Sequence, residues 1–406
     1  MKVTLVGMGL GNPDHLTRAA QTALQGADCL AGSKRLLEEC TLAPGVERFV
    51  STKSAEIVEY LLNTNHETAC VLYSGDTGFH SGVRTLLPLL RERGLEVEVL
   101  PGISSMQYLA SKLGQPWQDW QVVSAHGLSC DPVAAVLSAR GKPVFFLTGG
   151  AGGAGDLCKV LTDAGLGTLR ATIGQSLSYE EEKILTGHVW EFAEKNYAPL
   201  TVLLVEGFQS PYPYCSQGIE DEAFLRDEVP MTKQEVRAAV IGKLKVQEQG
   251  IYWDIGAGTG SVAVELALQA RQGQVYAVEC NPIAYRLIQA NRQKFGAYNL
   301  HLVEGKAPDC LANLPIPDGV FIGGTKGQLT PILDVILEKN PHAHICMTAI
   351  VLETLASAMK DLTDRGFEPQ VSQISVSRSK QVGTYHMMIG QNPVFLITVH
   401  KGEKQG

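Results

Sequence analysis

The chain has 406 residues, of which 45% are hydrophobic and 19% are charged, and its formal net charge is −8. This composition is typical of a globular protein with roughly two or three domains, each with its own core. The acidic balance argues against broad nucleic-acid binding, which needs a basic face, although a local basic cluster can still bind an anionic small substrate. The longest apolar runs, such as 144–147 and 202–205, have the length of strands and predict no transmembrane helix.

The N-terminus and the cysteines indicate a cellular compartment. An apolar strand is expected directly at residues 2–6, which leaves no room for a signal peptide. The nine cysteines stand singly, without a C-x-x-C pair or a metal-ligand spacing. We therefore expect small buried cysteines, no metal site and a cytoplasmic protein.

Glycine-rich or polar loops follow the predicted strands of the first half. These strands are expected at 2–6, 69–73, 97–100 and 144–147, and the loops begin at Gly7, Ser74, Pro101 and Thr148. Open α/β sheets bind their ligands at the carboxyl ends of strands, so these loops are candidate ligand contacts. For Ser104 and Ser105, capping of the helix that runs through Leu113 is an equally good explanation.

The order of these motifs resembles the tetrapyrrole methylase family over about residues 1–207. The matching residues are Gly7, Gly9, Gly11, Gly75-Asp76, Pro101-Gly102-Ile103-Ser104-Ser105 and Pro199-Leu200-Thr201-Val202. Thr77 departs from the family, which usually has a proline after Gly-Asp that makes the loop more rigid.

This resemblance implies a fold of two α/β lobes, with a cofactor folded in the cleft between them. The residues implied to surround the cofactor are Gly75, Asp76, Ser104, Ser105, Thr148, Pro199, Leu200, Thr201 and Val202. Asp76 fits a loop carboxylate better than a general base, and the first glycine loop, with Gly9, would face the tetrapyrrole. Diphthine synthases and a ribosomal RNA methylase share the fold, so the fold alone does not define the substrate.

Residues 208–222 are predicted to form a linker, because they are rich in proline and glycine and show no periodicity. The linker would separate a domain at 1–207 from a domain at 223–406. After it, Thr232 is expected to cap a helix, with Glu235 at the capping-box position three residues later.

The main motif of the second half is Asp254-Ile255-Gly256-Ala257-Gly258-Thr259-Gly260, which follows an apolar strand. A helical pattern and a second strand follow, and that strand ends in Glu279, whose carboxylate can accept hydrogen bonds from ribose hydroxyls. A dinucleotide site prefers Gly-x-Gly-x-x-Gly, whereas the spacing here is Gly-x-Gly-x-Gly. Asp254 disfavours a phosphate and suits a cationic ligand such as S-adenosylmethionine. The alternative is a tight strand–helix turn without a ligand.

Strands and helices continue to alternate after Glu279, which predicts a parallel sheet. Asn281 is expected to cap a helix that begins at Pro282 and stops at Gly296. The last two predicted strands, 371–376 and 394–399, have no long helix between them and can pair antiparallel.

The second half resembles the class I methyltransferases, and among them the precorrin and cobalt-precorrin C15-methyltransferase family, over about residues 220–400. The matching segments are 226–233, 254–260, 304–308, 322–324 and 348–354. The resemblance implies a Rossmann-like S-adenosylmethionine domain. The cofactor contacts that it implies are Thr232, Gly256, Ala257, Gly258, Thr259, Gly260, Glu279 and Ala307.

A chain that joins these halves resembles the bifunctional, decarboxylating methyltransferases of cobalamin biosynthesis. The resemblance implies S-adenosylmethionine-dependent methylation of a precorrin or cobalt-precorrin at C5 by the N-terminal domain. The C-terminal domain would methylate C15 and decarboxylate the ring C acetate. A substrate rich in acetates and propionates needs basic side chains, although each candidate can also be an ordinary solvated charge. The candidates are Arg226, Lys233, Arg237, Lys326, Arg378 and Lys380.

Decarboxylation also needs a proton donor or relay, since it leaves a carbanion-like centre. His386 is a candidate, although a lone histidine is more often structural, and Glu353 and Glu304 are no stronger candidates. No arrangement of nucleophile and base is visible, and methyl transfer does not require one.

Other functions remain open at this point. The C-terminal half alone could be active, or one half could be a scaffold that has lost its cofactor. A nucleotide or RNA methyltransferase is permitted by both folds but disfavoured by the acidic balance, and a dehydrogenase is disfavoured by the glycine spacing. We also expect a homo-oligomer, whereas the presence of cobalt in the ring is left undecided.

Overall fold

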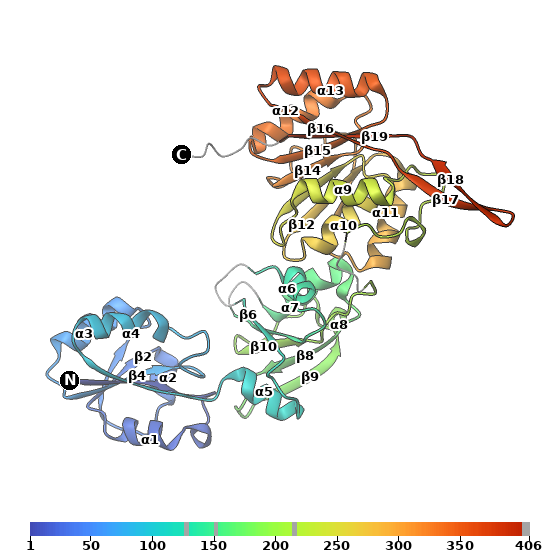
Figure 1. Ribbon diagram of the computed structural model, residues 1–406. Coiled ribbons are helices and arrows are strands. Elements are labelled where there is room, and N and C mark those ends of the chain that lie inside the picture. Colours follow the sequence, from blue (N-terminus) through green and yellow to red (C-terminus); the bar gives the residue numbers. More distant parts are fainter. Residues whose placement is uncertain (126–129, 150–152, 213–216, 400–406) are drawn as a thin grey trace. The chain divides into compact units, whose positions relative to one another are not determined.

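The computed structural model describes residues 1–125, 130–149, 153–212 and 217–399. The chain groups into two compact units (Figure 1). The first unit contains Met1–Cys130, Lys142–Thr162 and Gly167–Gly207, and the second contains Asp131–Gly141, Asp163–Leu166 and Phe208–Gly406. The predicted linker begins at the main boundary, after Gly207, and its residues 213–216 lie outside the described residues.

The first unit begins with a five-stranded parallel sheet in the order β3-β2-β4-β1-β5. Its strands are β1 (Lys2–Gly7), β2 (Cys29–Gly32), β3 (Glu47–Val50), β4 (Thr68–Tyr73) and β5 (Glu96–Leu100). The helices that connect them are η1 (Pro13–His15), α1 (Arg18–Gln25), α2 (Lys34–Glu39), α3 (Ser54–Asn63) and α4 (Val83–Glu92). Because the strands are parallel, the loops after β1, β4 and β5 lie at one edge of the sheet.

A second five-stranded sheet completes the first unit, in the order β6-β7-β10-β8-β9. Only β6 and β7 pair parallel, and the other neighbours pair antiparallel. The strands are β6 (Gln121–Ser124), β7 (Val144–Leu147), β8 (Arg170–Gln175), β9 (Lys183–His188) and β10 (Thr201–Val205). The helices of this stretch of chain are α5 (Ser105–Leu113), α6 (Pro132–Ser138), α7 (Ala154–Leu161), η2 (Thr162–Leu166) and α8 (Val189–Phe192).

The second unit contains a seven-stranded sheet in the order β13-β12-β11-β14-β15-β19-β16. Its strands are β11 (Ile251–Ile255), β12 (Gln274–Glu279), β13 (Leu300–Glu304), β14 (Gly319–Ile322), β15 (His344–Ala349), β16 (Gln370–Ile374) and β19 (Val394–Val399). The helices are η3 (Asp221–Ala223), α9 (Gln234–Leu244), α10 (Ser261–Gln269), α11 (Pro282–Phe295), α12 (Leu329–Lys339) and α13 (Leu352–Asp364).

Alternate residues of these strands supply two cores, one on each face of the sheet. Tyr252 packs with α9, α10 and α11, whereas its neighbour Trp253 packs on the other face with α12 and α13 (Figure 1). This alternation is expected of a sheet covered by helices on both faces, because successive side chains point to opposite sides. The predicted α/β fold class is therefore confirmed.

Two predictions about the second unit are confirmed and one is incomplete. The Asn281 side chain accepts a hydrogen bond from the Ile283 N–H at 2.9 Å, and α11 stops at a left-handed Gly296. The last two strands that the sequence predicts, β16 and β19, pair antiparallel as expected. The sequence pattern missed a two-stranded ribbon between them, formed by β17 (Ser377–Val382) and β18 (Tyr385–Gly390).

The prediction that Thr232 caps α9 is wrong. The N-cap is Lys233, which makes no side-chain cap, and the Gln234 N–H donates instead to Asp221 Oδ1 at 2.9 Å. The Glu235 carboxylate does not close a capping box, because it binds Arg378. A distant carboxylate therefore replaces the local cap, which no local sequence pattern can reveal.

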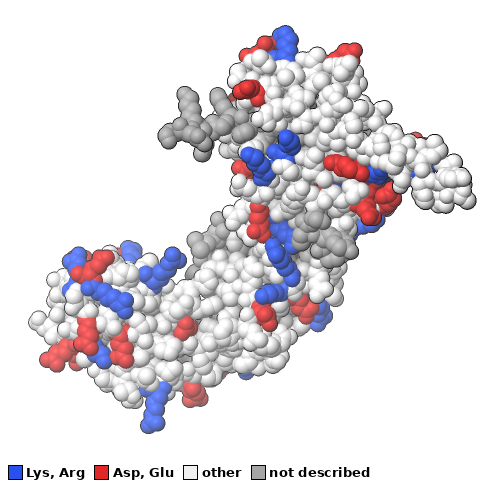
Figure 2. All heavy atoms as spheres, viewed as in Figure 1, with Lys and Arg blue, Asp and Glu red and all other residues white. Residues whose placement is uncertain are grey.

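On the face seen in Figure 2, basic and acidic side chains are interspersed over both units. Among the described residues, no helix combines the length and the apolar character that a membrane crossing requires.

We predict that Gly102→Ala destabilises the first unit. A Cβ atom at Gly102 would lie 2.3 Å from the Gly75 carbonyl oxygen and 2.7 Å from that of Gly7, so the loops after β1, β4 and β5 would have to separate. Overpacking of this kind costs about 1–3 kcal/mol in the free energy of unfolding. Urea unfolding of the full-length chain, monitored by hydrogen exchange in β1, measures the loss of unfolding free energy.

Gly26→Ala is the matched control, because its Cβ atom would meet only the Thr22 carbonyl oxygen at an ordinary 3.6 Å. An equal stability of the two variants would show that the three loops do not need their close approach.

Candidate active sites

A cavity of about 540 Å³ lies at the carboxyl ends of the central strands of the second unit. This volume is within the range of roughly 300–1,000 Å³ that small-molecule sites occupy. The predicted site residues in its wall are Thr232, Lys233, Gly256, Ala257, Gly258, Glu279, Ala307 and Lys326. Segments far apart in the sequence therefore meet where an open α/β sheet binds ligands.

The glycine loop after β11 forms the floor of this cavity through its backbone. Gly256 and Gly258 have φ angles of +72° and +55°, which side chains rarely adopt. A Cβ atom at Gly258 would lie 2.8 Å from the Pro230 carbonyl oxygen, and one at Gly256 would lie 2.7 Å from that of Gly324. The loop therefore needs glycine at both positions to fit between its neighbours.

The Glu279 carboxylate ties the end of β12 to this loop. Its Oε2 accepts from the Gly258 N–H at 2.9 Å, and its Oε1 accepts from the N–H groups of Cys280 and Asn281 at 2.8 and 2.9 Å. A carboxylate offers about four acceptor positions, so about one remains for a ligand hydroxyl. Glu279 thus holds the glycine loop in place and still has about one acceptor position for a hydroxyl group of a ligand.

The expectation that Asp254 faces a cationic ligand is wrong. Its side chain is completely buried and accepts a hydrogen bond from the Ala263 N–H at 2.9 Å, so it caps the start of α10 from within. Burial away from water raises the pKa of this carboxyl from its ordinary 3.8 to about 7, against the opposing effect of that hydrogen bond. The sequence position of Asp254, one strand residue from the loop, does not show that it points inward.

Several predicted residues lie outside the wall of this cavity. Thr259 is completely buried, and Gly260 packs against Ile288 at the start of α10, so the two residues belong to the turn behind the loop. The other predicted residues outside the wall are Arg226, Glu304, Glu353, Arg378, Lys380 and His386. Arg237, a candidate for substrate carboxylates, is 0% exposed and binds Glu265 at 2.5 Å, which contradicts that role.

Three lysines line the cavity: Lys233, Lys306 and Lys326. The Lys326 Nζ donates to the Cys280 Sγ at 3.1 Å, and this hydrogen bond raises the pKa of the ammonium. Lys326 therefore keeps its positive charge and is a better partner for an anion than a proton donor. Lys306 was missed as a site residue, although it belongs to the strand-end motif 304–308 that also contains the cis Ala307–Pro308 bond.

A second cavity of about 240 Å³ lies in the first unit. The predicted residues in its wall are Gly75, Ser105, Thr148, Pro199, Leu200, Thr201 and Val202. These residues come from both sheets of the unit, since Gly75 follows β4 whereas Thr148 and Thr201 belong to the β7 and β10 region. The Thr148 hydroxyl donates to the Thr201 carbonyl oxygen at 2.5 Å, which fixes two parts of this wall together.

Asp76, Ser104 and Gly9 support this cavity from outside its wall. Asp76 accepts from the Gly78 N–H at 2.8 Å and from the Gly102 N–H at 3.0 Å. Ser104 is the N-cap of α5 and forms a capping box with Gln107, so the capping alternative for this serine is confirmed. Gly9 pairs with Gly75 through two backbone hydrogen bonds of 3.1 and 2.7 Å.

Thr77, the departure from the family pattern, is buried and helps to hold the same loop. Its hydroxyl donates to the Leu100 carbonyl oxygen at 3.2 Å, which connects the loop after β4 to the end of β5. This hydrogen bond restricts the conformation of the loop, as the ring of a proline at this position would do in a different way.

Arg35 and Tyr179 are wall residues that the sequence did not reveal as a pair. The Arg35 guanidinium donates to the Tyr179 hydroxyl at 2.6 Å and to Glu39 at 2.8 Å, and the burial of Tyr179 raises the pKa of its phenol. Because 144 positions separate Arg35 from Tyr179, no local pattern indicates the contact.

Comparison with known proteins covers both units. A family described as tetrapyrrole (corrin/porphyrin) methylases matches residues 2–193, and a precorrin methyltransferase domain family matches residues 222–401. A precorrin-6Y C(5,15)-methyltransferase (decarboxylating) of a Sinorhizobium species is 32% identical over 402 residues, which cover 98% of this chain and 95% of that protein.

Relatives that match one half have about half the length of this chain. A probable cobalt-precorrin-6B C(15)-methyltransferase (decarboxylating) of Pyrobaculum calidifontis is 42% identical over 192 residues, which cover 47% of this chain and 98% of that protein. The crystal structure of a precorrin-6Y C5,15-methyltransferase from Geobacter metallireducens is 39% identical and covers 46% of this chain and 97% of its own, with a TM-score of 0.44.

We predict a pH-dependent stability that depends on Asp254. The raised pKa means that the folded chain keeps a proton on this carboxyl where the unfolded chain has lost it. The resulting stabilisation is complete below about pH 4 and disappears as the pH rises through about 7. Relative to Asp254→Asn, the wild type should lose at most about 1.4 kcal/mol of unfolding free energy per pH unit in this window.

Urea unfolding of the full-length protein across this pH window, monitored by hydrogen exchange in β11, measures the difference in unfolding free energy between wild type and Asp254→Asn. Asp318→Asn is a suitable control, because Asp318 accepts from the Ile251 N–H at the opposite, exposed end of the same strand. A difference between wild type and Asp254→Asn that is constant with pH would show that Asp254 is ionised throughout.

Proposed function

The chain belongs to the precorrin-6Y C5,15-methyltransferase (decarboxylating) family, and from this membership we propose how its two cavities divide the work. It is a methyltransferase of cobalamin biosynthesis that acts on a precorrin and also decarboxylates it. We propose that the cavity of the first unit serves C5 methylation and that the cavity of the second unit serves C15 methylation and decarboxylation. The division is supported by the C15-methyltransferase relatives, which match a stretch as long as the second half alone.

We propose S-adenosylmethionine as the methyl donor at both sites, with the domains at 1–207 and 223–406 and a connecting segment at 208–222. In the second unit, the single observation that carries this proposal is the glycine loop with Glu279 beside it at the carboxyl ends of β11 and β12. Backbone N–H groups, one free carboxylate acceptor position and an apolar wall fit an amino-acid-bearing nucleoside. The segments that contain Thr232 and Ala307 would complete this binding site for the methyl donor.

The donor supplies an electrophilic methyl group, and the chain's own residues have to position the acceptor carbon in line and exclude water. The apolar part of the wall suits this task, since Val262, Phe321 and Ile350 line it. Ile350 continues into Val351 and Leu352, which are 54% and 66% exposed. Together with Ile350 in the wall, they form an exposed apolar surface that is suited to contact the face of a macrocycle.

The three wall lysines fit the carboxylates of the same substrate. Lys233, Lys306 and Lys326 would orient acetate and propionate groups by charge-assisted hydrogen bonds. In the decarboxylation, the bond between the acetate methylene and its carboxylate breaks, carbon dioxide leaves, and the electron pair passes to the macrocycle. A proton then returns to carbon. Lys326 is not proposed as its donor because its pKa is raised, and the relay roles of His386 and Glu353 stay predictions, since neither lines the cavity.

In the first unit, Gly75, Ser105, Thr148, Pro199 and Thr201 would hold the donor. Asp76 and Ser104 would act through the loops that they fasten, and Gly9 would keep the first glycine loop next to Gly75. Substrate contacts of Arg226 also stay a prediction. We further propose that the protein is cytoplasmic and that it forms a homo-oligomer. The exposed apolar side chains of Tyr385, Met387 and Met388 on β18 support the second of these proposals.

Mass spectrometry of the products tests the division of labour. Full-length enzyme would be incubated with S-adenosylmethionine and a precorrin substrate, with and without cobalt in the ring. We expect two methyl gains and the loss of one carbon dioxide with the wild type. Gly258→Ala should abolish C15 methylation and carbon dioxide loss, because its Cβ atom would push the loop away from Pro230. Gly102→Ala should abolish only the C5 methyl gain.

A single methyl gain with decarboxylation by the wild type would show that the first unit is inactive. Loss of both methyl gains in either single variant would contradict the assignment of one reaction to each cavity. No change of either ring would contradict the corrin substrate.

A further inference from the structure

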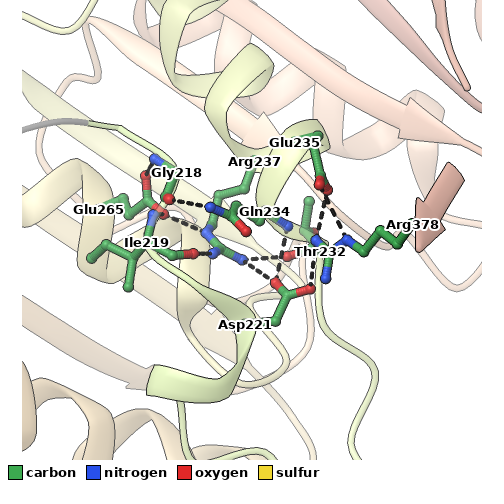
Figure 3. Close-up of polar contacts among 9 residues, drawn as sticks. All are labelled: Gly218, Ile219, Asp221, Thr232, Gln234, Glu235, Arg237, Glu265 and Arg378. Carbon is green, nitrogen blue, oxygen red and sulfur yellow. Dashed lines mark hydrogen bonds and ion pairs between the residues drawn. The ribbon is translucent and has the colours of Figure 1, made fainter. Parts of the chain in front are cut away.

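The β17–β18 ribbon grows out of the wall of the second cavity. Val376, directly before β17, and Gln391 and Asn392, directly after β18, line that cavity. Arg378, the second residue of β17, reaches from this ribbon to the start of α9 (Figure 3). Its guanidinium donates to the two Glu235 oxygens at 3.1 and 2.7 Å and lies 3.2 Å from Asp221 Oδ2.

Another part of the cavity wall is formed by Val229–Lys233, which we call the cavity strap. All five strap residues line the cavity, and the Pro230 carbonyl oxygen is the atom that a Cβ at Gly258 would meet. The strap therefore lies directly on the glycine loop. Its position decides how much room the cavity offers above that loop.

Two buried charged residues, Arg237 and Asp221, hold the strap in position (Figure 3). The Arg237 guanidinium donates to the Thr232 carbonyl oxygen at 2.5 Å and lies 3.4 Å from Asp221 Oδ1. The same Asp221 oxygen accepts from the Gln234 N–H, the first residue of α9. Arg237 also binds Glu265 and the Ile219 carbonyl oxygen, so the strap is connected to α10 and to the segment directly before η3.

Arg378 adds a second positive charge to this network, next to Asp221. Among the described residues, Asp221 Oδ2 accepts no hydrogen bond, and Arg378 is the cation beside it. The Asp221 side chain is only 5% exposed, so removal of the Arg378 guanidinium leaves Oδ2 of a poorly solvated carboxylate without a cation beside it. Glu235 is 40% exposed and would regain water, which makes Asp221 the sensitive member of the network.

We propose that Arg378 is a positioning residue rather than a binding residue for substrate carboxylates. Through Glu235 and Asp221 it connects the cavity end of the β17–β18 ribbon to the cavity strap. Its Nε and one terminal nitrogen are already engaged by Glu235 and Asp221. Arg378 thereby couples these two parts of the cavity wall, and it acts on the methyl donor through Asp221 and the strap. The proposal rests on the proposed function in that the donor is taken as the ligand of this cavity.

A double-mutant cycle on the full-length enzyme tests the proposal. The variants are Arg378→Gln, Glu235→Gln and the double variant, and the matched control is Arg365→Gln. Arg365 binds Asp334 and Asp361 near the end of α13, outside the cavity wall. Calorimetry measures the Kd of S-adenosylmethionine, and hydrogen exchange of the ligand-free enzyme follows the peptide 229–236, which contains the Gln234 amide.

We expect Arg378→Gln to raise the Kd by roughly fivefold, the factor that about 1 kcal/mol of lost coupling produces. The exchange of the Gln234 amide should quicken in the same variant. Glu235→Gln should have a smaller effect in the same direction, because it leaves the contact between Arg378 and Asp221 in place. The double variant should be no worse than Arg378→Gln, because that change alone already removes the contact with Glu235. The kcat should change less than the Kd, and Arg365→Gln should match the wild type in both readouts.

The proposal is overturned if Arg378→Gln raises only the KM of the precorrin and leaves the strap exchange and the donor Kd unchanged. Fully additive effects of the two single variants would also contradict it. A wild type that does not bind the donor would contradict the proposed function instead. The exchange measurement would still decide whether Arg378 holds the strap, since it needs no ligand.

Discussion

Loops at the carboxyl ends of strands expose backbone N–H groups, and in this protein side-chain carboxylates satisfy many of them. Glu279 accepts three such N–H groups around the glycine loop, and Asp76 accepts two around the loops after β4 and β5. A buried N–H group without an acceptor is costly, so each carboxylate determines which loop conformations are allowed. The shape of each candidate site depends on this arrangement.

The same constraint explains why several acidic residues near the sites are not free for chemistry. Asp254 caps α10 from inside the protein, and Glu265 accepts from the N–H groups of Gly218 and Ile219 while it pairs with Arg237. These groups hold backbone segments rather than move protons. Such an architecture suits methyl transfer, because that reaction depends on positioning and on the exclusion of water more than on acid–base groups.

Charge is distributed differently in the buried network and in the cavity wall of the second unit. Arg237 and Arg378 are matched to Asp221, Glu235 and Glu265, so their positive charge is already used within the fold. Lys233, Lys306 and Lys326 line the cavity itself. Arginine suits the first task because its planar group binds carboxylates at two points, whereas the compact lysine ammonium can follow a mobile carboxylate.

Local patterns in the sequence were sufficient for many of the strands and helices and for the loops that carry the sites, although they missed the β17–β18 ribbon. The spacing of glycines after an apolar strand, the capping serine at Ser104 and the Asn281-Pro282 helix start all act within a few residues, so they can be read without the fold. For that reason the parallel part of the second unit's sheet, its antiparallel end pair and the glycine and polar loops of the cavity walls were predicted from the sequence.

The tertiary structure alone decided the direction and the partner of each polar side chain. Asp254 points into the core, Thr259 lies behind its loop, and the start of α9 is capped by Asp221 rather than by Thr232. Arg378 and Glu235 are 143 positions apart, and Arg35 and Tyr179 are 144 apart. Contacts over such separations depend on how sheets and helices pack, and packing is a property of the whole unit rather than of any local segment.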